Sequence, residues 1–276
     1  MVRFRFPRFD ARTALREARH ALASLAFPAP CRICAATLLE ASRVPVCGEC
    51  LASLRPLSGP SCQCCGRTFL SAAAGQAHTP LCHLCRRGGY AFDLARSYGA
   101  YQATMVQAIT LLKYQAVTPL GGWFGARLAE VVAGQPKELA ADVVVPVPLH
   151  ATRLRERGYN QAELIGRPLA SRLGLPFRSC LLVRTRPRPD KLKLTRQERW
   201  STVRGAFAMR EAGRVDNLRV LLVDDVLTTG ATLDACARAL RKAGAARIAG
   251  LTVARVVPDG FLPSLAREQQ PGVSAE

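Results

Sequence analysis

The residues of this chain best suited to chemistry lie together between Val220 and Thr232. Thr228, Thr229 and Thr232 offer hydroxyl donors in a turn between an apolar, β-branched segment and a segment with apolar residues at helical spacing. A helix that begins after such a turn directs its unpaired N–H groups and the positive end of its dipole into the turn. Such an arrangement favours a bound phosphate, so we expect a phosphate-binding loop here.

Two adjacent carboxylates, Asp224 and Asp225, precede the threonines. A carboxylate repels a phosphate at contact distance, so these two must serve another part of a ligand. Vicinal sugar hydroxyls, with a divalent metal ion nearby, are the natural partners. The elements that position these residues are a strand predicted from Arg219 to Val223 and a helix predicted from Leu233 to Ala243.

Residues 220–232 resemble the phosphoribosyl pyrophosphate (PRPP) signature of type I phosphoribosyltransferases. They do not form a P-loop, since the pattern G-x-x-x-x-G-K-[ST] is absent. The alternative is a buried strand that ends in a solvated acidic turn with an N-capping threonine, which would explain any three of these residues but not all of them. The resemblance implies that the ribose hydroxyls contact Asp224 and Asp225, which are the candidate catalytic residues. It implies that the 5′-phosphate contacts Thr228, Thr229, Gly230, Ala231 and Thr232.

Most of the 11 cysteines fall in one region, in four pairs with C-x-x-C spacing. The pairs are Cys31 with Cys34, Cys47 with Cys50, Cys62 with Cys65, and Cys82 with Cys85. Each pair sits on a tight turn that directs both thiolates to one tetrahedral ion, so two pairs complete a four-thiolate zinc site. We expect two structural zinc sites, because four protein ligands leave no coordination position open for water.

Which pairs share an ion stays open from spacing alone. Sequential pairing would resemble a double zinc ribbon, and interleaved pairing is the alternative. Cys64 could replace Cys62 or be a spare thiol, and His78 and His83 could substitute for a thiolate. Disulfides or redox C-x-x-C chemistry are weaker interpretations, because adjacent half-sites of this spacing make poor structural disulfides.

Strand and helix patterns alternate from about Ala91 to Val257, which predicts an α/β domain with a largely parallel sheet. A predicted strand from Val143 to Val147 leads into a basic turn with Arg153, Arg155 and Arg157. Ligands bind beyond the carboxyl ends of such strands, so this turn and the phosphate loop could face the same crevice. The three arginines would suit a diphosphate, and a solvated charged face is the alternative.

Three further features remain. Lys113 follows an apolar helical stretch and is another candidate ligand residue, although a lysine in that place is usually solvated. The basic segment from Arg184 to Arg204 is long and carries signals of irregular structure, which predicts a mobile lid or a nucleic-acid contact. Cys180 and Cys236 lie in apolar surroundings and are expected in the core.

The length of 276 residues makes two domains a reasonable expectation, and the apolar fraction of 49% is that of a globular protein. The formal net charge of +19 implies an anionic partner such as nucleic acid, which the chain would bind with release of counterions. The alternative is that the charge only offsets bound anions and keeps the chain in solution. No run approaches the roughly 18 uninterrupted apolar residues of a membrane span.

The first residues, Met1 to Pro30, combine several arginines with a short apolar run and could mimic a signal peptide. Asp10 and Glu17 interrupt the basic region, which favours a basic helix or arm instead. The C-x-x-C pairs are expected to bind metal as reduced thiolates, and reduced thiols favour a cytoplasmic location.

The combination resembles the ComF-type proteins of bacterial competence, in which a zinc-ribbon region precedes a phosphoribosyltransferase-like domain. The match covers about Cys31 to Val257. It rests on the cysteine pairs, the segment 111–114, the segments 145–150 and 153–162, and the run 223–232. Lys191 and Thr202 stand where the family pattern has a glutamine and an asparagine, so any role of those two amides is not carried over.

The resemblance implies a double zinc ribbon over 31–90 and a type I phosphoribosyltransferase-like domain over 91–260. Outside the match we expect a basic segment over 1–30 and a flexible tail over 261–276. It implies binding of PRPP with Mg²⁺, with the arginine turn and the Mg²⁺ on the pyrophosphate, and a role in DNA uptake and natural transformation. Whether transfer occurs, and to which acceptor, stays open. The alternative is a single-stranded-DNA-binding protein or an adaptor for DNA-uptake proteins that uses the fold as a phosphate-binding scaffold.

Overall fold

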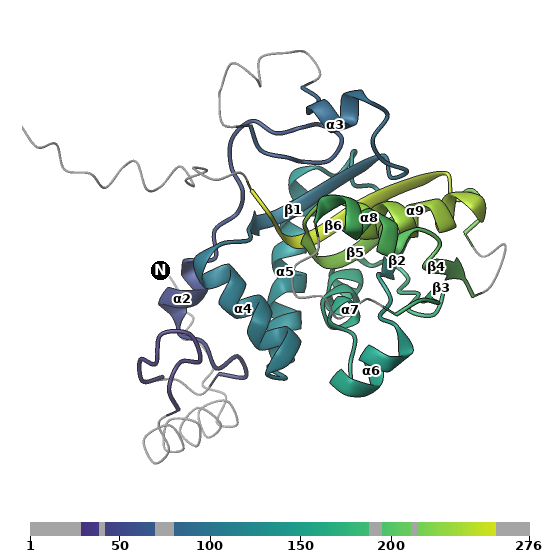
Figure 1. The fold of residues 1–276 in the computed structure, drawn as a ribbon. Helices are drawn as coiled ribbons and strands as arrows, with labels where there is room; N and C mark the ends of the chain where they lie inside the picture. The colour runs from purple at the N-terminus through teal and green to yellow at the C-terminus, as the bar shows by residue number, and fades with distance from the viewer. Residues whose placement is uncertain (1–28, 39–41, 70–79, 188–194, 211–214, 258–276) are drawn as a thin grey trace, which may run out of the picture. The chain divides into compact units, whose positions relative to one another are not determined.

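The structure is a computed structural model that describes residues 29–38, 42–69, 80–187, 195–210 and 215–257 (Figure 1). The chain divides into two compact units, Met1–Leu54 and Arg55–Glu276. The predicted basic segment (except residues 29 and 30), the predicted tail, His78 and Lys191 lie outside the described residues. The second set of cysteine pairs shares its unit with the sheet, and the domain boundary expected near residue 90 stays a prediction.

Two turns carry the cysteines of the first unit. The N–H of Ala35 donates to the carbonyl of Cys31 at 2.9 Å, and Ala35 has a φ of 61°, so the chain reverses directly after the first pair. The second pair begins the short helix α2 (Gly48–Ala52), where the Cys47 sulfur accepts a hydrogen bond from the N–H of Cys50 at 3.5 Å. Sulfur therefore caps this helix in the place that an oxygen usually takes.

The second unit repeats this design. The N–H of Gly66 donates to the carbonyl of Cys62 at 2.8 Å, with Gly66 at a φ of 67°. Cys82 is the N-cap residue of the short helix α3 (His83–Arg86). Each set thus combines one hairpin-like turn with the first turn of a helix, which is why both cysteines of every pair reach a common point.

The second unit is built on a parallel sheet with strand order β1-β6-β5-β2. The strands are β1 (Leu94–Ala100), β2 (Val143–Pro146), β5 (Arg219–Leu227) and β6 (Arg247–Arg255). The inner strands β5 and β6 are almost entirely buried, as near-continuous Val, Leu and Ile runs require in a sheet covered on both faces. The predicted α/β fold with a mostly parallel sheet is confirmed. Because β2 and β5 are parallel neighbours, the loops that follow them meet at one edge.

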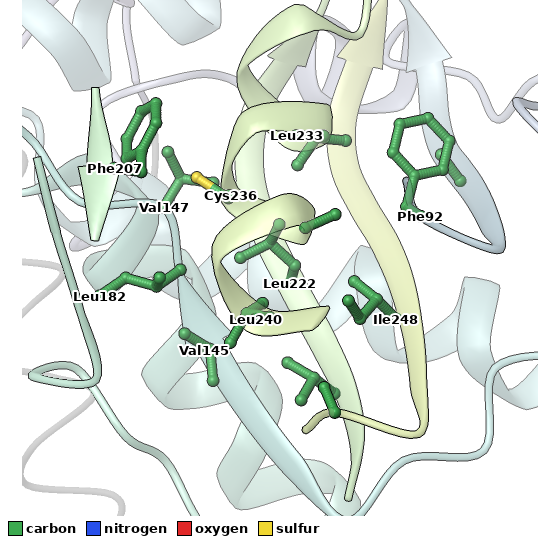
Figure 2. Close-up of a cluster of buried hydrophobic side chains, with 14 of the residues drawn as sticks. Phe92, Val145, Val147, Leu182, Phe207, Leu222, Leu233, Cys236, Leu240 and Ile248 are labelled. Carbon is green, nitrogen blue, oxygen red and sulfur yellow. The ribbon is translucent and has the colours of Figure 1, made fainter. Parts of the chain in front are cut away.

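Helices cover both faces of this sheet. On one face α9 (Ala231–Lys242) places Leu233, Cys236 and Leu240 against Val145 and Leu222 (Figure 2). Alternation along a strand puts the neighbouring residues on the opposite face.

On that opposite face α5 (Pro119–Gly134) packs against α7 (Gln161–Leu173). The two helices approach closely, since a Cβ on Gly121 would lie 2.7 Å from the carbonyl oxygen of Leu164. Gly166 of α7 in turn faces Val144. The helix α4 (Ala103–Tyr114) precedes α5 and carries Lys113 in its last turn.

Three short elements lie between α7 and β5. The strands β3 (Leu182–Arg184) and β4 (Phe207–Met209) pair antiparallel. The segment between them was expected to be irregular, but it is helical over α8 (Arg196–Val203), while residues 188–194 are outside the described part. A capping box explains this helix, because Thr195 accepts from the N–H of Glu198 and Glu198 accepts from the N–H of Thr195.

The structure corrects other sequence expectations. The strand β5 runs to Leu227, so both aspartates lie inside it, and α9 begins two residues before Leu233. The basic turn after β2 is the helix α6 (Ala151–Arg157), capped by the His150 ring at one end and by Gly158 in the left-handed conformation at the other. Cys236 is buried as predicted, but Cys180 is exposed and the core assignment was wrong for it.

Candidate functional site

A cavity of about 340 Å³ lies where β2 and β5 end. Its wall combines the loop after β5, the first turn of α9, the helix α6 and the last turn of α4. Nine of the predicted site residues line it: Lys113, Arg153, Arg157, Asp224, Asp225, Thr228, Thr229, Ala231 and Thr232. The sheet topology therefore brings together two segments that are about 70 positions apart in the sequence.

The phosphate-binding loop predicted after β5 spans Thr228 to Gly230, and α9 follows it directly. Gly230 has a φ of 83°, a conformation that glycine adopts without strain, and it lets the chain turn sharply into the helix. Thr229 Oγ1 accepts a weak hydrogen bond of 3.4 Å from the N–H of Ala231. The amide groups of the first turn of a 12-residue helix thus meet threonine hydroxyls at the cavity wall.

Asp234 in the first turn of α9 is buried, and its charge is compensated. Its carboxylate accepts from the N–H of Ala91 at 2.6 Å and pairs with Arg238 at 2.8 Å. It does not line the cavity, so it does not oppose an anion there.

Lys113 and Asp225 form an ion pair across the cavity floor, with 2.6 Å between Lys113 Nζ and Asp225 Oδ1. Only 18% of the lysine side chain and 6% of the aspartate side chain are exposed. Burial lowers the pKa of Lys113, but the Asp225 carboxylate outweighs it and the net shift is upward. Lys113 was a candidate ligand residue, and it lines the cavity; the solvated alternative does not hold. Its ion pair was not predicted, because the partner comes from a strand more than 100 residues away.

Asp224 has a different environment. Burial and the charge of Asp225 raise its pKa from 3.8 to about 7, while Lys113 partly opposes the shift. The N–H of Asp225 donates to Asp224 Oδ1 at 2.8 Å. Two adjacent carboxyl groups thus differ, since Asp225 pairs directly with a lysine and Asp224 exchanges its proton near neutral pH.

The predicted arginine set divides between two faces of α6. Arg153 and Arg157 are four residues apart, share a face of the helix and line the cavity. Arg155 is exposed and is not among the lining residues. Arg157 donates to the side chain of Gln161, and its guanidinium lies 5.1 Å from the ring centre of Tyr114.

Other cavity residues were not predicted as ligands. Arg184 lines the wall from β3, and its guanidinium lies 5.3 Å from the ring centre of Phe207. Its place at the start of the long basic segment gave no signal that separated it from the other arginines there. His150 also lines the cavity, and its Nδ1 accepts from the N–H of Thr152 at 3.3 Å, so its ring caps the start of α6.

The cysteines gather in sequential order. Cys31, Cys34, Cys47 and Cys50 form one group, and Cys62, Cys65, Cys82 and Cys85 form the other; within each, the sulfur atoms lie within 4.8 Å of one another. Cys64 and His83 belong to neither group. The sulfurs of Cys34 and Cys47 are 3.6 Å apart, as are those of Cys65 and Cys82. Tetrahedral zinc with bonds of about 2.3 Å spaces its sulfurs about 3.8 Å apart, so both groups fit zinc ribbons.

One thiol in each group is poised to ionise. Burial raises the pKa of Cys31, but hydrogen bonds from the N–H groups of Cys34, Cys47 and Ile33 outweigh it and lower the pKa to about 6. A hydrogen bond from Cys65 lowers the pKa of Cys62 to about 4 despite burial. Thiolates are the metal-binding form, so each group offers a starting ligand at neutral pH.

Among the described helices, none has the length and apolar character needed to cross a bilayer.

Comparisons with known proteins agree with the fold. Residues 160–258 match the family described as phosphoribosyl transferase domain. Competence protein F of Haemophilus influenzae is 34% identical over 108 residues, 39% of this chain and 47% of that protein. DNA utilization protein YhgH of Escherichia coli K12 is 34% identical over 107 residues, 39% of this chain and 46% of that protein. The chain thus spans about half the length of these relatives.

Competence protein ComFC of Bacillus subtilis is 26% identical over 217 residues, which cover 76% of this chain and 84% of that protein. Among solved structures, the PRPP amidotransferase of Bacillus subtilis covers 49% of this chain and 26% of its own at 24% identity, with a TM-score of 0.34. The purine phosphoribosyltransferase of Pyrococcus horikoshii covers 50% of this chain and 80% of its own at 22% identity, with a TM-score of 0.32.

Proposed function

We propose that this chain, whose two cysteine groups, phosphoribosyltransferase domain and competence-protein relatives fit the ComF family, binds PRPP with Mg²⁺ and acts in DNA uptake. The observation that carries the proposal is one cavity with three kinds of lining. Hydroxyls at a helix N-terminus lie at one part of the wall, two carboxyl groups at another, and two arginines at a third. These match a monophosphate, a sugar diol and a diphosphate in one ligand.

The 5′-phosphate is assigned to the loop from Thr228 to Thr232. The N–H groups at the start of α9 carry partial positive charge, and they donate without any side-chain rearrangement. Thr228 and Thr229 add hydroxyl donors from half-buried positions. Gly230 contributes the turn that exposes these amides.

The ribose hydroxyls are assigned to Asp224 and Asp225. Each carboxylate can accept hydrogen bonds from a hydroxyl, and together they can share a vicinal pair. Lys113 Nζ lies 2.6 Å from Asp225 Oδ1 and compensates its charge in a buried setting, which supports this acceptor role. Negative charge beside the sugar would also stabilise positive charge that develops at C1 as the bond to pyrophosphate loosens.

The pyrophosphate is assigned to Arg153 and Arg157 together with Mg²⁺. Guanidinium groups bind phosphate oxygens through paired N–H donors, and the two arginines lie on one face of α6. Mg²⁺, when bound, neutralises charge on the leaving pyrophosphate. Arg155 lies on a different face, so we leave it out of the pyrophosphate site.

Calorimetry with PRPP and Mg²⁺ tests the binding proposal. The full chain should bind PRPP more tightly with Mg²⁺ than without it, and Asp224→Asn combined with Asp225→Asn should weaken binding at least tenfold. A matched control is Asp142→Asn, since Asp142 pairs with Arg219 at the amino end of β5, away from the cavity. Unchanged affinity in the double variant would remove the assigned ribose roles.

A second candidate function is binding of single-stranded DNA, with the phosphate site as a scaffold rather than a catalytic centre. The net charge of +19 favours it, as do the names of the relatives, which concern competence and DNA utilization. Binding of an oligonucleotide measured against salt concentration should give a steep slope if counterions are released. No binding at low salt would dismiss this candidate and leave recruitment of DNA-uptake proteins as the link to competence.

Catalysis is separable from both candidates. Release of pyrophosphate from PRPP in the presence of free bases would identify a transferase and its acceptor, whereas binding without release would identify a phosphoribosyl-binding scaffold.

We further propose that each cysteine group holds one structural Zn²⁺, and that the free thiols place the chain in a reducing compartment such as the cytoplasm.

A further inference from the structure

Tyr90 is in direct contact with the phosphate-binding loop. Its hydroxyl donates to the carbonyl of Thr229 at 2.9 Å. A Cβ on Gly230 would lie 2.6 Å from Tyr90 Cε1, so the ring leaves no room for a larger residue at position 230. The Tyr90 side chain therefore makes two contacts with the loop: its hydroxyl donates to the Thr229 carbonyl, and its ring packs against the backbone of Gly230.

The Tyr90 ring is itself fixed by stacking. Its centre lies 4.5 Å from that of Phe92, with the two planes 16° apart, and 6.0 Å from that of Trp200 in α8. Phe92 is 2% exposed and belongs to the core between α9 and the sheet. Moving the Tyr90 ring would disturb this stack, so the phosphate loop rests on a rigid support.

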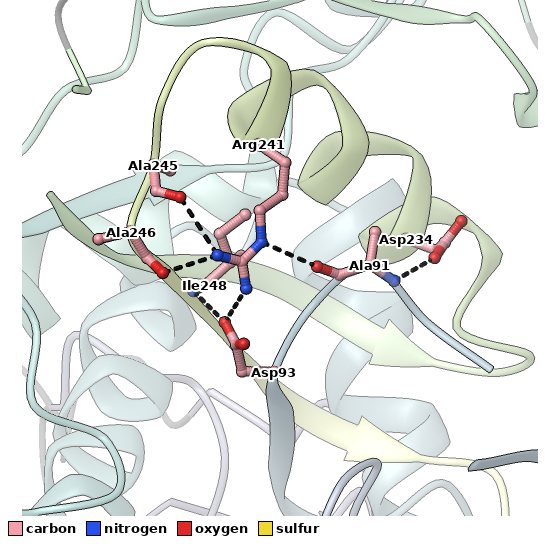
Figure 3. Close-up of polar contacts among 7 residues, drawn as sticks. All are labelled: Ala91, Asp93, Asp234, Arg241, Ala245, Ala246 and Ile248. Carbon is pink, nitrogen blue, oxygen red and sulfur yellow. Dashed lines mark hydrogen bonds and ion pairs between the residues drawn. The ribbon is translucent and has the colours of Figure 1, made fainter. Parts of the chain in front are cut away.

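The segment that begins at Tyr90 is bound to both the first and the last turn of α9 (Figure 3). The N–H of Ala91 donates to Asp234 in the first turn at 2.6 Å. Arg241 in the last turn donates to the carbonyl of Ala91 at 3.4 Å and pairs with Asp93, which also accepts from the N–H of Ile248 at 2.7 Å. The position of α9, and with it the loop at its start, thus depends on residues 90–93.

The same segment follows directly from the second cysteine group. Only four residues separate Cys85 from Tyr90, and they fold back on α3. The N–H of Gly88 donates to the carbonyl of Cys85 at 3.2 Å, and a Cβ on Gly89 would lie 2.6 Å from the carbonyl oxygen of Leu84. So tight a connection transmits a displacement of α3 to Tyr90.

The other half of the group is attached to the sheet. The carbonyl of Cys64 accepts from the N–H of Ala95 in β1 at 2.7 Å, and the carbonyl of Cys65 accepts from Arg255 in β6 at 2.6 Å. Arg255 is 2% exposed, so this contact is part of the core. A metal ion bound by all four sulfurs would link this sheet-bound turn to α3, and through α3 to Tyr90.

We infer that Tyr90 is a positioning residue of the phosphate-binding loop, and that a metal ion at Cys62, Cys65, Cys82 and Cys85 holds the loop in its binding geometry through Tyr90. The naming of the ligand as a phosphoribosyl 5′-phosphate rests on the proposed function. The control of loop geometry by the metal does not, because it follows from contacts within the protein.

Hydrogen exchange of the full chain, with zinc and without any phosphoribosyl ligand, tests the metal part. Cys85→Ser opens the second group, and Cys50→Ser is the matched control because it opens the first group. We expect Cys85→Ser to raise the exchange rate at residues 228–234 by about tenfold or more relative to wild type, with little change in β2, and Cys50→Ser to leave both unchanged. Equal loop protection in Cys85→Ser and wild type would overturn the inference.

Tyr90→Phe tests the positioning role with the metal site intact. It removes one hydrogen bond and keeps the stacked ring, so the affinity for ribose 5-phosphate should fall by about three- to tenfold and the affinity of zinc should not change. Tyr98→Phe is the control, since Tyr98 packs edge-on against Trp123 on the α5 side of the sheet. If both variants bind alike, Tyr90 does not position the loop. If wild type binds no ribose 5-phosphate, the proposed function fails. The inference is then still tested by comparing hydrogen exchange at residues 228–234 between Tyr90→Phe and Tyr98→Phe, and equal rates would overturn it.

Discussion

Lys113 Nζ and Asp225 Oδ1 lie 2.6 Å apart in a largely buried ion pair that joins the end of α4 to the end of β5. Taking either charge out of water is costly, and the pair persists because each compensates the other. The next carboxyl group along the strand, Asp224, has no such direct partner among the ion pairs of the described residues, and its pKa is raised to about 7. Burial and the charge of Asp225 raise the pKa of Asp224, and the charge of Lys113 opposes them.

Replacing Lys113 by methionine should destabilise the second unit strongly. The change leaves Asp225 buried without its cation, and breaking a buried pair from one side costs about 3–5 kcal/mol. Urea unfolding followed by Trp fluorescence would measure the loss. Lys137→Met is the control, since Lys137 is exposed, and should stay within about 0.5 kcal/mol of wild type.

A second change separates the charge effect from packing. Lys113→Met combined with Asp225→Asn removes both charges, so it should be less destabilised than Lys113→Met alone. Equal losses in the single and double variants would mean that the lysine stem, and not the ion pair, stabilises the fold.

The pH dependence of stability should show the raised pKa of Asp224. Folding raises this pKa above its ordinary value of 3.8, so the group contributes stability at low pH that is lost as the pH rises through about 7. Compared with Asp224→Asn, wild type should therefore lose stability between about pH 4 and pH 7. The charged or titratable groups that line this site with Asp224 are Asp225, Lys113, Arg184, His150, Arg153, Arg157, Tyr101 and Tyr114. Parallel pH profiles of unfolding in the two proteins would contradict the shift.

Ligand binding should have the opposite pH dependence. The ribose hydroxyls need a carboxylate acceptor, so below the pKa the affinity for PRPP with Mg²⁺ should rise by up to about tenfold per pH unit as Asp224 ionises. Calorimetry at pH 6.5 in buffers with different ionisation enthalpies would detect the released proton. Asp224→Asn should bind without that proton release, whereas an unchanged proton count would assign the linkage to another group.

The sequence predicted the elements whose signals are local. The run 220–232 carries its strand, its turn and its helix within thirteen residues, and the cysteine pairs carry their own turns, so both appear in the structure nearly as expected. The pairing of Lys113 with Asp225 could not be predicted in this way, because it depends on which strand α4 ends against. Likewise, the sequence grouped Arg155 with Arg153 and Arg157 because all three were expected in one turn. In the structure they lie on the helix α6, where residues two positions apart are on different faces.

The α6 arginines give a matched comparison on one helix. Arg157→Gln should weaken binding of PRPP with Mg²⁺ by about 10- to 150-fold, since a charge-assisted contact to a phosphate is worth about 1.5–3 kcal/mol, and should leave ribose 5-phosphate binding unchanged. Arg155→Gln removes the same charge from the exposed face and should leave both affinities unchanged. Calorimetry with both ligands separates the pyrophosphate from the 5′-phosphate. Equal effects of the two substitutions would point to net charge rather than to a cavity contact.

Metal content should follow the grouping of the sulfurs, with Cys64 as the internal control. Wild type should hold two zinc ions per chain by mass spectrometry under native conditions, Cys62→Ala one, and Cys64→Ala two, because Cys64 lies outside both groups. The consequences for stability should differ between the groups. Cys62, Cys65 and Cys82 are buried in the core that contains α9, so Cys62→Ala should lower the melting temperature of the second unit. Cys34→Ala opens the group of the first unit and should leave that transition in place. A chain that loses one ion on substitution of Cys64 and none on substitution of Cys62 would show that Cys64, and not Cys62, is the ligand.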